Sequence, residues 1–135
     1  MVPRGTPFPT DDPGFEAKAL CLHLAREAAV PSLARRVFFD RGALDHLAYA
    51  RSGHWELTPA EIRSCTRPRY DLAFLIEPPP AGIPTLSHAE AAFVGQLVAQ
   101  IESVYAEAGI PLIRVPYRPC DERARLILHQ VTDRG

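Results

Sequence analysis

The 135-residue sequence predicts an α/β domain built on a small parallel sheet of about three strands with flanking helices. Three short apolar runs, at 36–39, 72–77 and 112–115, have the length and composition of buried parallel strands. Segments with helical spacing of apolar residues separate these runs, and helical connections between strands give right-handed crossovers and parallel pairing. The chain is long enough to bury a single core, so we expect one domain.

The first part of the chain predicts an irregular segment and then a helix. Residues 1–11 are rich in proline, so we expect no regular structure there and an ordered domain over 12–135. Asp12-Pro13 predicts a helix start, because Asp is a good N-cap and Pro fits the first helical position. This helix is expected to run to about Ala29 and to stop at Val30-Pro31.

The middle of the chain predicts two helices between the first and second strands. One is expected from about Leu44 to Arg51, where apolar residues recur at helical spacing. The sequence Thr58-Pro59-Ala60-Glu61 is a capping box with proline at the first helical position, and it predicts the start of the other. The strand at 72–77 then ends in three consecutive prolines, which favour a rigid exit from the sheet.

The last part of the chain predicts a long helix, the third strand and a final helix. Ser87 and Glu90 form a second capping box, and Gly109 has the position of a left-handed helix cap. Between them, apolar residues repeat at helical spacing at Phe93, Leu97, Ile101, Val104, Tyr105 and Ala108. The strand at 112–115 follows. The final helix is expected to place four apolar residues on one face, namely Ala124, Ile127, Leu128 and Val131.

Composition favours a soluble cytoplasmic protein. Apolar residues make up 47% of the chain and charged residues 23%, as in ordinary globular domains. The net charge of −1 gives no electrostatic reason to expect nucleic acid or a membrane as a partner. No apolar run reaches the roughly 20 residues of a membrane span. The three cysteines are widely spaced and odd in number, which favours reduced thiols over a disulfide framework.

The segment after the first predicted strand holds the main candidate for a functional site. Asp40 follows Val37-Phe38-Phe39 where a strand would end, and open α/β sheets bind ligands at the carboxyl ends of their strands. Such an Asp can hold Mg²⁺ through water or act as a base, although a plain turn-forming role stays open. Gly42 is expected to allow either a close backbone approach or a positive φ angle.

Residues 40–49, Asp-Arg-Gly-Ala-Leu-Asp-His-Leu-Ala-Tyr, resemble the Asp-Arg-Gly-x-x-Asp-x-Leu-Ala-Tyr signature of a family of AAA-type ATP-binding domains. This family includes the nicotinamide riboside kinase domain of a bacterial NAD-metabolism regulator. The resemblance continues through residues 70–79 and 105–116 and through Glu122-Arg123, and extends from about Pro9 to Gln130. It implies a three-layer, P-loop NTPase-like parallel sheet.

The resemblance also implies a kinase-like site that uses ATP or GTP with Mg²⁺ and a small-molecule phosphate acceptor. Asp40 would handle the Mg²⁺ through water, Arg41 would contact phosphate, and Asp45 would orient a substrate hydroxyl. Arg118 and Arg123 would lie near the adenine. Each has a simpler alternative: a surface salt bridge for Arg41, a dipole-favoured acid in the first helical turn for Asp45, and no nucleotide contact for Arg118 and Arg123.

A Walker A segment is not present in the sequence. A P-loop needs Gly-x-x-x-x-Gly-Lys-Ser/Thr, whereas the single lysine, Lys18, has no flanking pair of glycines. In the family the P-loop lies upstream on the first strand, so we expect an N-terminally truncated domain that begins after it. The segment 78–88 also holds no arginine that could serve as a lid residue.

The lost first strand would leave the strands at 37–39 and 72–76 without their shared central neighbour. Those two strands would then pair directly, or another segment would fill the gap, because open apolar edges promote association. Two function classes therefore stay open. One is an ATP-binding, kinase-like domain without its Walker A segment. The other is a non-catalytic interaction or scaffold module of the same fold that forms a homo-oligomer through its strand edges.

Overall fold

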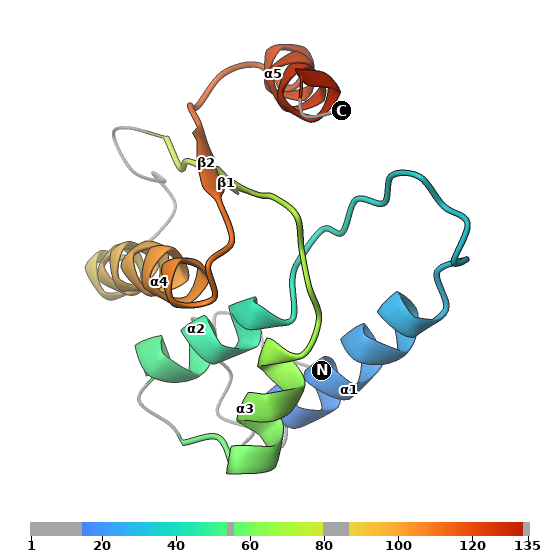
Figure 1. Cartoon of the computed structure of the whole chain (residues 1–135). Helices are drawn as coiled ribbons and strands as arrows, with labels where there is room; N and C mark the ends of the chain where they lie inside the picture. The colour runs from blue at the N-terminus through green and yellow to red at the C-terminus, as the bar shows by residue number, and fades with distance from the viewer. Residues whose placement is uncertain (1–14, 54–55, 80–86, 134–135) are drawn as a thin grey trace.

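The computed structural model describes residues 15–53, 56–79 and 87–133, and Figure 1 shows a two-stranded sheet with helices around it. The elements in chain order are α1 (Phe15–Ala28), α2 (Leu44–Gly53), α3 (Pro59–Thr66), β1 (Ala73–Ile76), α4 (His88–Glu107), β2 (Leu112–Val115) and α5 (Cys120–Asp133). The expected irregular segment at 1–11 and the helix start at Asp12-Pro13 lie outside the described residues. The predicted α/β class with a parallel sheet is confirmed.

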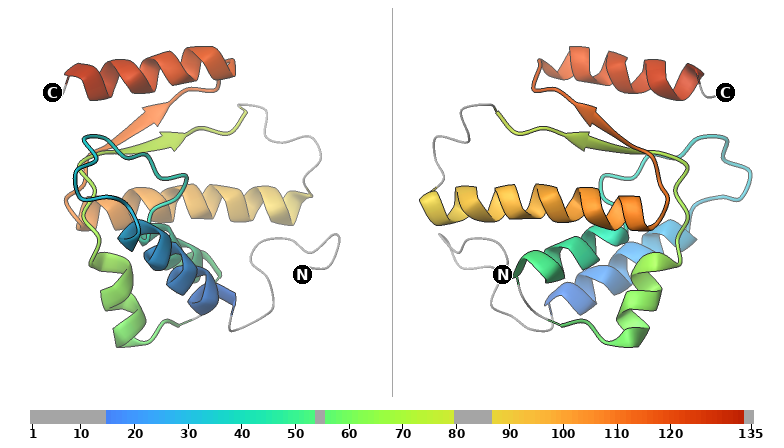
Figure 2. Two further views of the ribbon diagram at one scale, coloured as in Figure 1. Left: turned by 90° about the vertical axis from the view of Figure 1, so that its right-hand side faces the viewer. Right: turned by 60° about the vertical axis from the view of Figure 1, so that its left-hand side comes forward.

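The sheet lies between helices. Figure 2 shows α5 over one face of the β1–β2 pair and α4 over the other. Helix α2 packs along α4 on the side away from the sheet, and α1 and α3 pack on α2. This order places the loop before α2 beneath the sheet, beside the C-terminal half of α4.

Local signals in the sequence fix several element ends. The Thr58 Oγ1 accepts the Glu61 N–H at 3.1 Å, while Glu61 Oε1 accepts the Thr58 N–H at 3.1 Å, so the predicted capping box begins α3. At the start of α4 the Ser87 Oγ accepts the Glu90 N–H at 3.2 Å. Gly109 ends that helix with a φ of 74°, as predicted for a left-handed cap.

The buried core is centred on the contact between α2 and α4. One cluster of buried side chains comprises Leu44, Ala48, Val104 and Tyr105. A second cluster lies between α1, α3 and the residue before α2, and comprises Leu20, Ala43 and Cys65. Strands β1 and β2 pair in parallel with Ala73 opposite Leu112. The core therefore anchors the beginning of α2 from two sides.

The strand predicted at 36–39 does not form, and the sheet of the described residues has two strands instead of three. Val37, Phe38 and Phe39 lie outside any helix or strand and are 41%, 58% and 40% exposed, so the expectation of a buried strand is wrong. Direct pairing with β1, one of the two alternatives expected for this segment, is not found, and Figure 1 shows the segment running apart from β1. An apolar run becomes a strand only when a neighbouring strand accepts its backbone hydrogen bonds.

Contacts other than strand pairing hold the segment of residues 36–39 in place. Arg36 Nη2 donates to the carbonyl oxygen of Val131 at 3.5 Å, which ties it to the end of α5. The Phe39 ring meets the Tyr70 ring edge-on at a centroid distance of 6.2 Å and the His23 ring at 6.5 Å. The segment therefore spans from the layer of α5 to the layer of α1.

The final helix forms as predicted, but its apolar face is only partly covered. Ile127 and Val131 are half-buried, whereas Leu128 is 53% exposed and Ala124 is exposed. Two strands about 4.8 Å apart are a narrow support for a helix roughly 10 Å in diameter. A third strand beside β1 would widen that support.

Candidate functional site

The candidate site is the turn of residues Asp40–Ala43, which precedes α2 and is called the Asp40 turn below. Asp40 and Arg41 are both exposed. The Arg41 guanidinium lies over the ring of Tyr49, 5.3 Å from its centroid, a distance at which a cation is attracted to an aromatic face. The turn tightens into the helix through a hydrogen bond from Asp45 N–H to the Gly42 carbonyl oxygen at 3.1 Å. The two charged side chains are thus presented at the surface from a compact turn.

Asp45 points back into the turn. Its Oδ2 accepts the Gly42 N–H at 3.2 Å, and its Oδ1 accepts the Tyr105 hydroxyl at 2.8 Å. Burial raises the pKa of Asp45, and the hydrogen bonds from Tyr105 and Gly42 and the charge of Arg41 oppose that rise. Both oxygens of Asp45 therefore already have donors within the protein, and its expected contact with a substrate hydroxyl stays a prediction.

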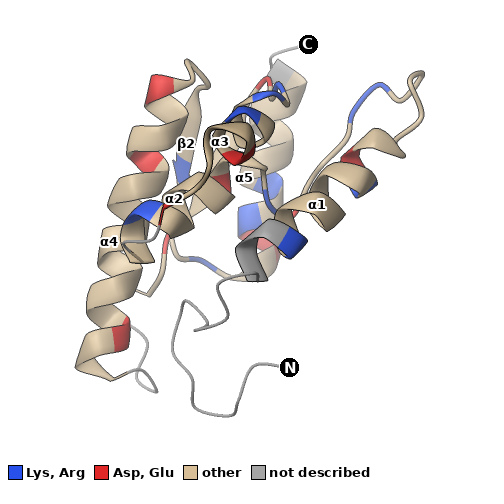
Figure 3. Ribbon diagram, turned by 90° about the horizontal axis from the view of Figure 1, so that it is seen from below, with Lys and Arg blue, Asp and Glu red and all other residues tan. Residues whose placement is uncertain are grey.

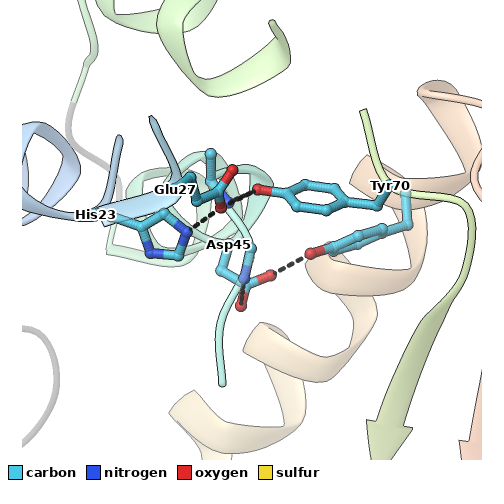
Figure 4. A network of polar contacts seen from close by, with 7 residues as sticks. His23, Glu27, Asp45 and Tyr70 are labelled. Carbon is cyan, nitrogen blue, oxygen red and sulfur yellow. Dashed lines mark hydrogen bonds and ion pairs between the residues drawn. The ribbon is translucent and has the colours of Figure 1, made fainter. Parts of the chain in front are cut away.

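Tyr70 holds the other side of the turn. Its hydroxyl oxygen accepts the Ala43 N–H at 2.7 Å and donates its own proton to Glu27 Oε2 at 2.6 Å. His23, one turn earlier on α1, is hydrogen-bonded to the same Glu27 oxygen. Burial raises the pKa of Tyr70, with the Glu27 carboxylate adding to the rise, so the phenol stays protonated as a donor. Figure 4 shows these bonds and the bond to Asp45 converging from α1, α2, α4 and the segment before β1.

Gly42 is required by a close approach and not by its backbone angle. A Cβ atom at this position would lie under 3.0 Å from the Tyr105 hydroxyl oxygen and 3.3 Å from Tyr70 Cε2. Its φ is not in the positive range, unlike that of Gly109. Of the two sequence-based alternatives, the structure therefore selects the close approach between the turn and two tyrosines.

Arg118 and Arg123 lie apart from the Asp40 turn. Arg118 Nη1 donates to the Tyr117 carbonyl oxygen at 3.0 Å, and Arg123 Nη2 donates to Cys120 Sγ at 3.0 Å. Arg118 lies in the loop before α5 and Arg123 lies near the beginning of α5, the helix that covers the opposite face of the sheet from α2. Within the described residues neither arginine forms a hydrogen bond or ion pair with the turn, so their expected role at a nucleotide stays a prediction.

The carboxylates at the turn are better suited to hold Mg²⁺ through bound water than to coordinate a metal ion directly. Where the structure describes the chain, no group of three or more His, Cys, Asp or Glu side chains could hold a metal ion. Mg²⁺ usually keeps several waters and takes one or two carboxylates together with substrate phosphates. The exposed carboxylate of Asp40 fits that kind of ligand, whereas both oxygens of Asp45 already accept hydrogen bonds within the protein.

Sequence reasoning did not identify the polar network around the turn. His23, Glu27, Tyr70 and Tyr105 all contribute to it, although only Tyr105 was expected in the core. The spacing of His23 and Glu27, four residues apart on one helix, was a signal that these two side chains meet. The tyrosine contacts span 43 and 60 residues of sequence and had no such local signal. Figure 3 shows that the charged residues are otherwise spread over the helices with both signs mixed.

The fold and the turn define a class of protein. A parallel sheet flanked by helices, with an acidic turn leading into one of them, is compatible with an α/β nucleotide-binding domain of the P-loop type. The chain belongs to the AAA domain family, whose model matches residues 4–123. No curated protein and no solved structure shows a significant match. No described helix is both long and apolar enough to cross a membrane.

Proposed function

We propose that this chain is the part of a kinase-like P-loop domain that follows the phosphate-binding segment, and that Asp40 and Arg41 face the nucleotide phosphates and Mg²⁺. The observation that carries the proposal is the exposed Asp40–Arg41 pair, presented by a partly buried hydrogen-bond network in a chain of the AAA domain family. Site residues on a turn that is fixed from beneath are typical of positioned catalytic groups.

Each residue of the turn has a distinct task in this proposal. The Asp40 carboxylate holds a water of the Mg²⁺ shell or accepts a proton from the acceptor hydroxyl. The Arg41 guanidinium contacts phosphate oxygens, whose geometry its planar fork of N–H donors matches. Bound ATP or GTP with Mg²⁺ supplies the phosphoryl group, and the acceptor is a small molecule. Arg118 and Arg123 are proposed to contact the nucleotide away from its phosphates.

Three features support a further strand in the complete domain. The N–H groups of Ala73 and Glu77 donate to the carbonyl oxygens of Pro111 and Val115 at 2.9 Å each. The alternate residues Phe74 and Ile76 therefore direct their backbone groups to the outer edge of β1. Among the described residues no strand pairs with that edge. Val37, Phe38 and Phe39 before α2 and Leu128 on α5 also leave apolar side chains exposed. A strand leading into a P-loop would lie there and complete a three-layer sheet.

The proposal is tested by titration calorimetry with MgATP on two proteins. The 135-residue chain is expected to bind weakly or not at all, because P-loop backbone N–H groups normally supply most phosphate contacts. A version extended by the coding sequence upstream of Met1, if that encodes a strand and Gly-x-x-x-x-Gly-Lys-Ser/Thr, is expected to bind with micromolar affinity. Micromolar binding by the 135-residue chain alone would refute the missing-P-loop argument. Failure of the P-loop-containing version to bind would refute the proposed function.

The second candidate is a non-catalytic module that forms a homodimer through its strand edges. It is favoured by the free outer edge of β1 and by three consecutive exposed apolar residues at 37–39. The net charge of −1 gives two copies little repulsion. Light scattering on the purified chain tests it: a dimer is expected, and a monomer at high concentration would count against this candidate.

A further inference from the structure

We propose that Tyr105 is a positioning residue for the Asp40 turn, and that its hydroxyl, acting through Asp45 and Gly42, sets where Asp40 and Arg41 stand. The inference rests on the proposed function only in taking Asp40 and Arg41 as the groups that meet the nucleotide. The arrangement of the turn itself is independent of any ligand.

The Tyr105 ring is a fixed point in the molecule. It lies near the C-terminal end of α4, is only 5% exposed, and packs in the cluster with Leu44, Ala48 and Val104. Because this cluster joins α4 to α2, the ring has little freedom to move relative to either helix. Burial, together with the Asp45 carboxylate, also raises the pKa of Tyr105, so the hydroxyl keeps its proton and remains a donor.

The hydroxyl of Tyr105 acts on the turn in two ways. It donates to Asp45 Oδ1 at 2.8 Å, and this holds the carboxylate so that Oδ2 accepts the Gly42 N–H at 3.2 Å. Its oxygen also fills the space that a Cβ atom on residue 42 would need. The first contact pulls the turn toward α4 and the second sets how close it comes.

Tyr70 completes the clamp from the opposite side. Its hydroxyl oxygen accepts the next backbone donor, Ala43 N–H, at 2.7 Å, and its ring lies 3.3 Å from the space beside Gly42. Consecutive amides of the turn are therefore held by groups that lead back to two tyrosines, one on α4 and one just before β1. Asp40 and Arg41 extend from a backbone tied to both the helix layer and the sheet, and such preorganisation is what a site for charge stabilisation requires.

The test in solution compares three single variants of the chain by NMR. Tyr105→Phe keeps the ring and removes the hydroxyl, so the pKa of Asp45 is expected to rise further, because the Tyr105 hydrogen bond lowers it. Exchange of the Gly42 amide proton should speed up by roughly tenfold or more, as expected when a hydrogen bond to a charged group loses its support. Tyr70→Phe removes the other hydroxyl and should leave the pKa of Asp45 near its original value. Tyr117→Phe removes the hydroxyl of a half-exposed tyrosine and should change neither quantity.

A kinetic arm separates positioning from simple packing. In a version that carries a P-loop, Tyr105→Phe is expected to lower kcat at least tenfold with a smaller change in KM. The same substitution added to Asp40→Asn should cause little further loss, because its effect passes through Asp40. Asp45→Asn, which keeps the shape of the side chain, provides a second way to disturb the turn.

The outcomes are distinguishable. Unchanged Asp45 titration and Gly42 exchange in Tyr105→Phe would overturn the proposal, whatever the activity. A changed pKa of Asp45 and faster exchange of the Gly42 amide proton with an unchanged kcat would also overturn the proposal, because the turn would then move without any effect on activity. If the original protein with its P-loop has no activity, the proposed function fails, while the effect of Tyr105 on the turn is still decided by the NMR arm.

Discussion

A methyl group added at Gly42 is a direct probe of the packing around the Asp40 turn. In Gly42→Ala the new Cβ would lie under 3.0 Å from the Tyr105 hydroxyl oxygen. Overpacking of this kind costs about 1–3 kcal/mol. Because the φ of residue 42 is not positive, alanine also gains about 0.4–1 kcal/mol from a less flexible unfolded chain. We therefore expect a net loss of about 1–2 kcal/mol in the free energy of unfolding.

The same substitution should cost much less in a Tyr105→Phe background. Once the hydroxyl is gone, the nearest atom to the new Cβ is Tyr70 Cε2 at 3.3 Å, a tight but tolerable contact. Tyr105→Phe alone should cost about 1–3 kcal/mol, since Asp45 loses a hydrogen bond. The double variant should then be more stable than the sum of the two single losses implies, with a coupling energy of about 1 kcal/mol.

Urea unfolding followed by circular dichroism measures all four proteins of this cycle. Gly95→Ala is the matched control, because no atom lies within 4 Å of the added Cβ and the residue lies inside α4. It should stabilise the protein by about 0.5–1 kcal/mol in either background. Losses that simply add, with a coupling energy below about 0.3 kcal/mol, would refute the argument that the Tyr105 hydroxyl excludes a side chain at residue 42.

Three further predictions concern charge, activity and capping. Because the pKa of Asp45 is raised in the folded protein, its contribution to stability is fully present below pH 3.8 and is lost as pH rises through the folded pKa. Asp45→Asn should therefore remove this fall in the free energy of unfolding with pH, measured by urea unfolding across the acidic range. An unchanged pH dependence would assign the fall to other groups. Asp40→Asn in a P-loop-containing version should leave the thermal unfolding temperature unchanged, because Asp40 is exposed. The same variant should greatly reduce Mg²⁺-dependent phosphoryl transfer, and full activity would mean that Asp40 is a turn residue only. Thr58→Ala removes the acceptor for the Glu61 N–H and should lower the free energy of unfolding in urea by about 1 kcal/mol. Thr58→Ser keeps a hydroxyl acceptor and should retain most of that stability. Equal losses in the two variants would exclude capping as the cause.

The sequence by itself determined the elements whose defining bonds lie within a few residues. The capping box at Thr58 starts α3, the Ser87 cap starts α4, and Gly109 ends α4 with a positive φ. The apolar runs that form β1 and β2 were also predicted within one or two residues of their ends. In each case the physical signal, a side chain that bonds a nearby amide or an allowed backbone angle, is contained in the local sequence.

The tertiary structure alone decided the remaining features. The run Val37-Phe38-Phe39 has the composition of a strand, but it has no partner strand among the described residues and remains exposed outside the sheet. Asp45 has the position of an ordinary first-turn acid, and only the approach of Tyr105, 60 residues away, places it in a partly buried clamp. Strand pairing and hydrogen bonds between side chains both require a partner group. Where that partner is distant in sequence, tertiary packing decides whether it comes close, and the local sequence around the residue does not.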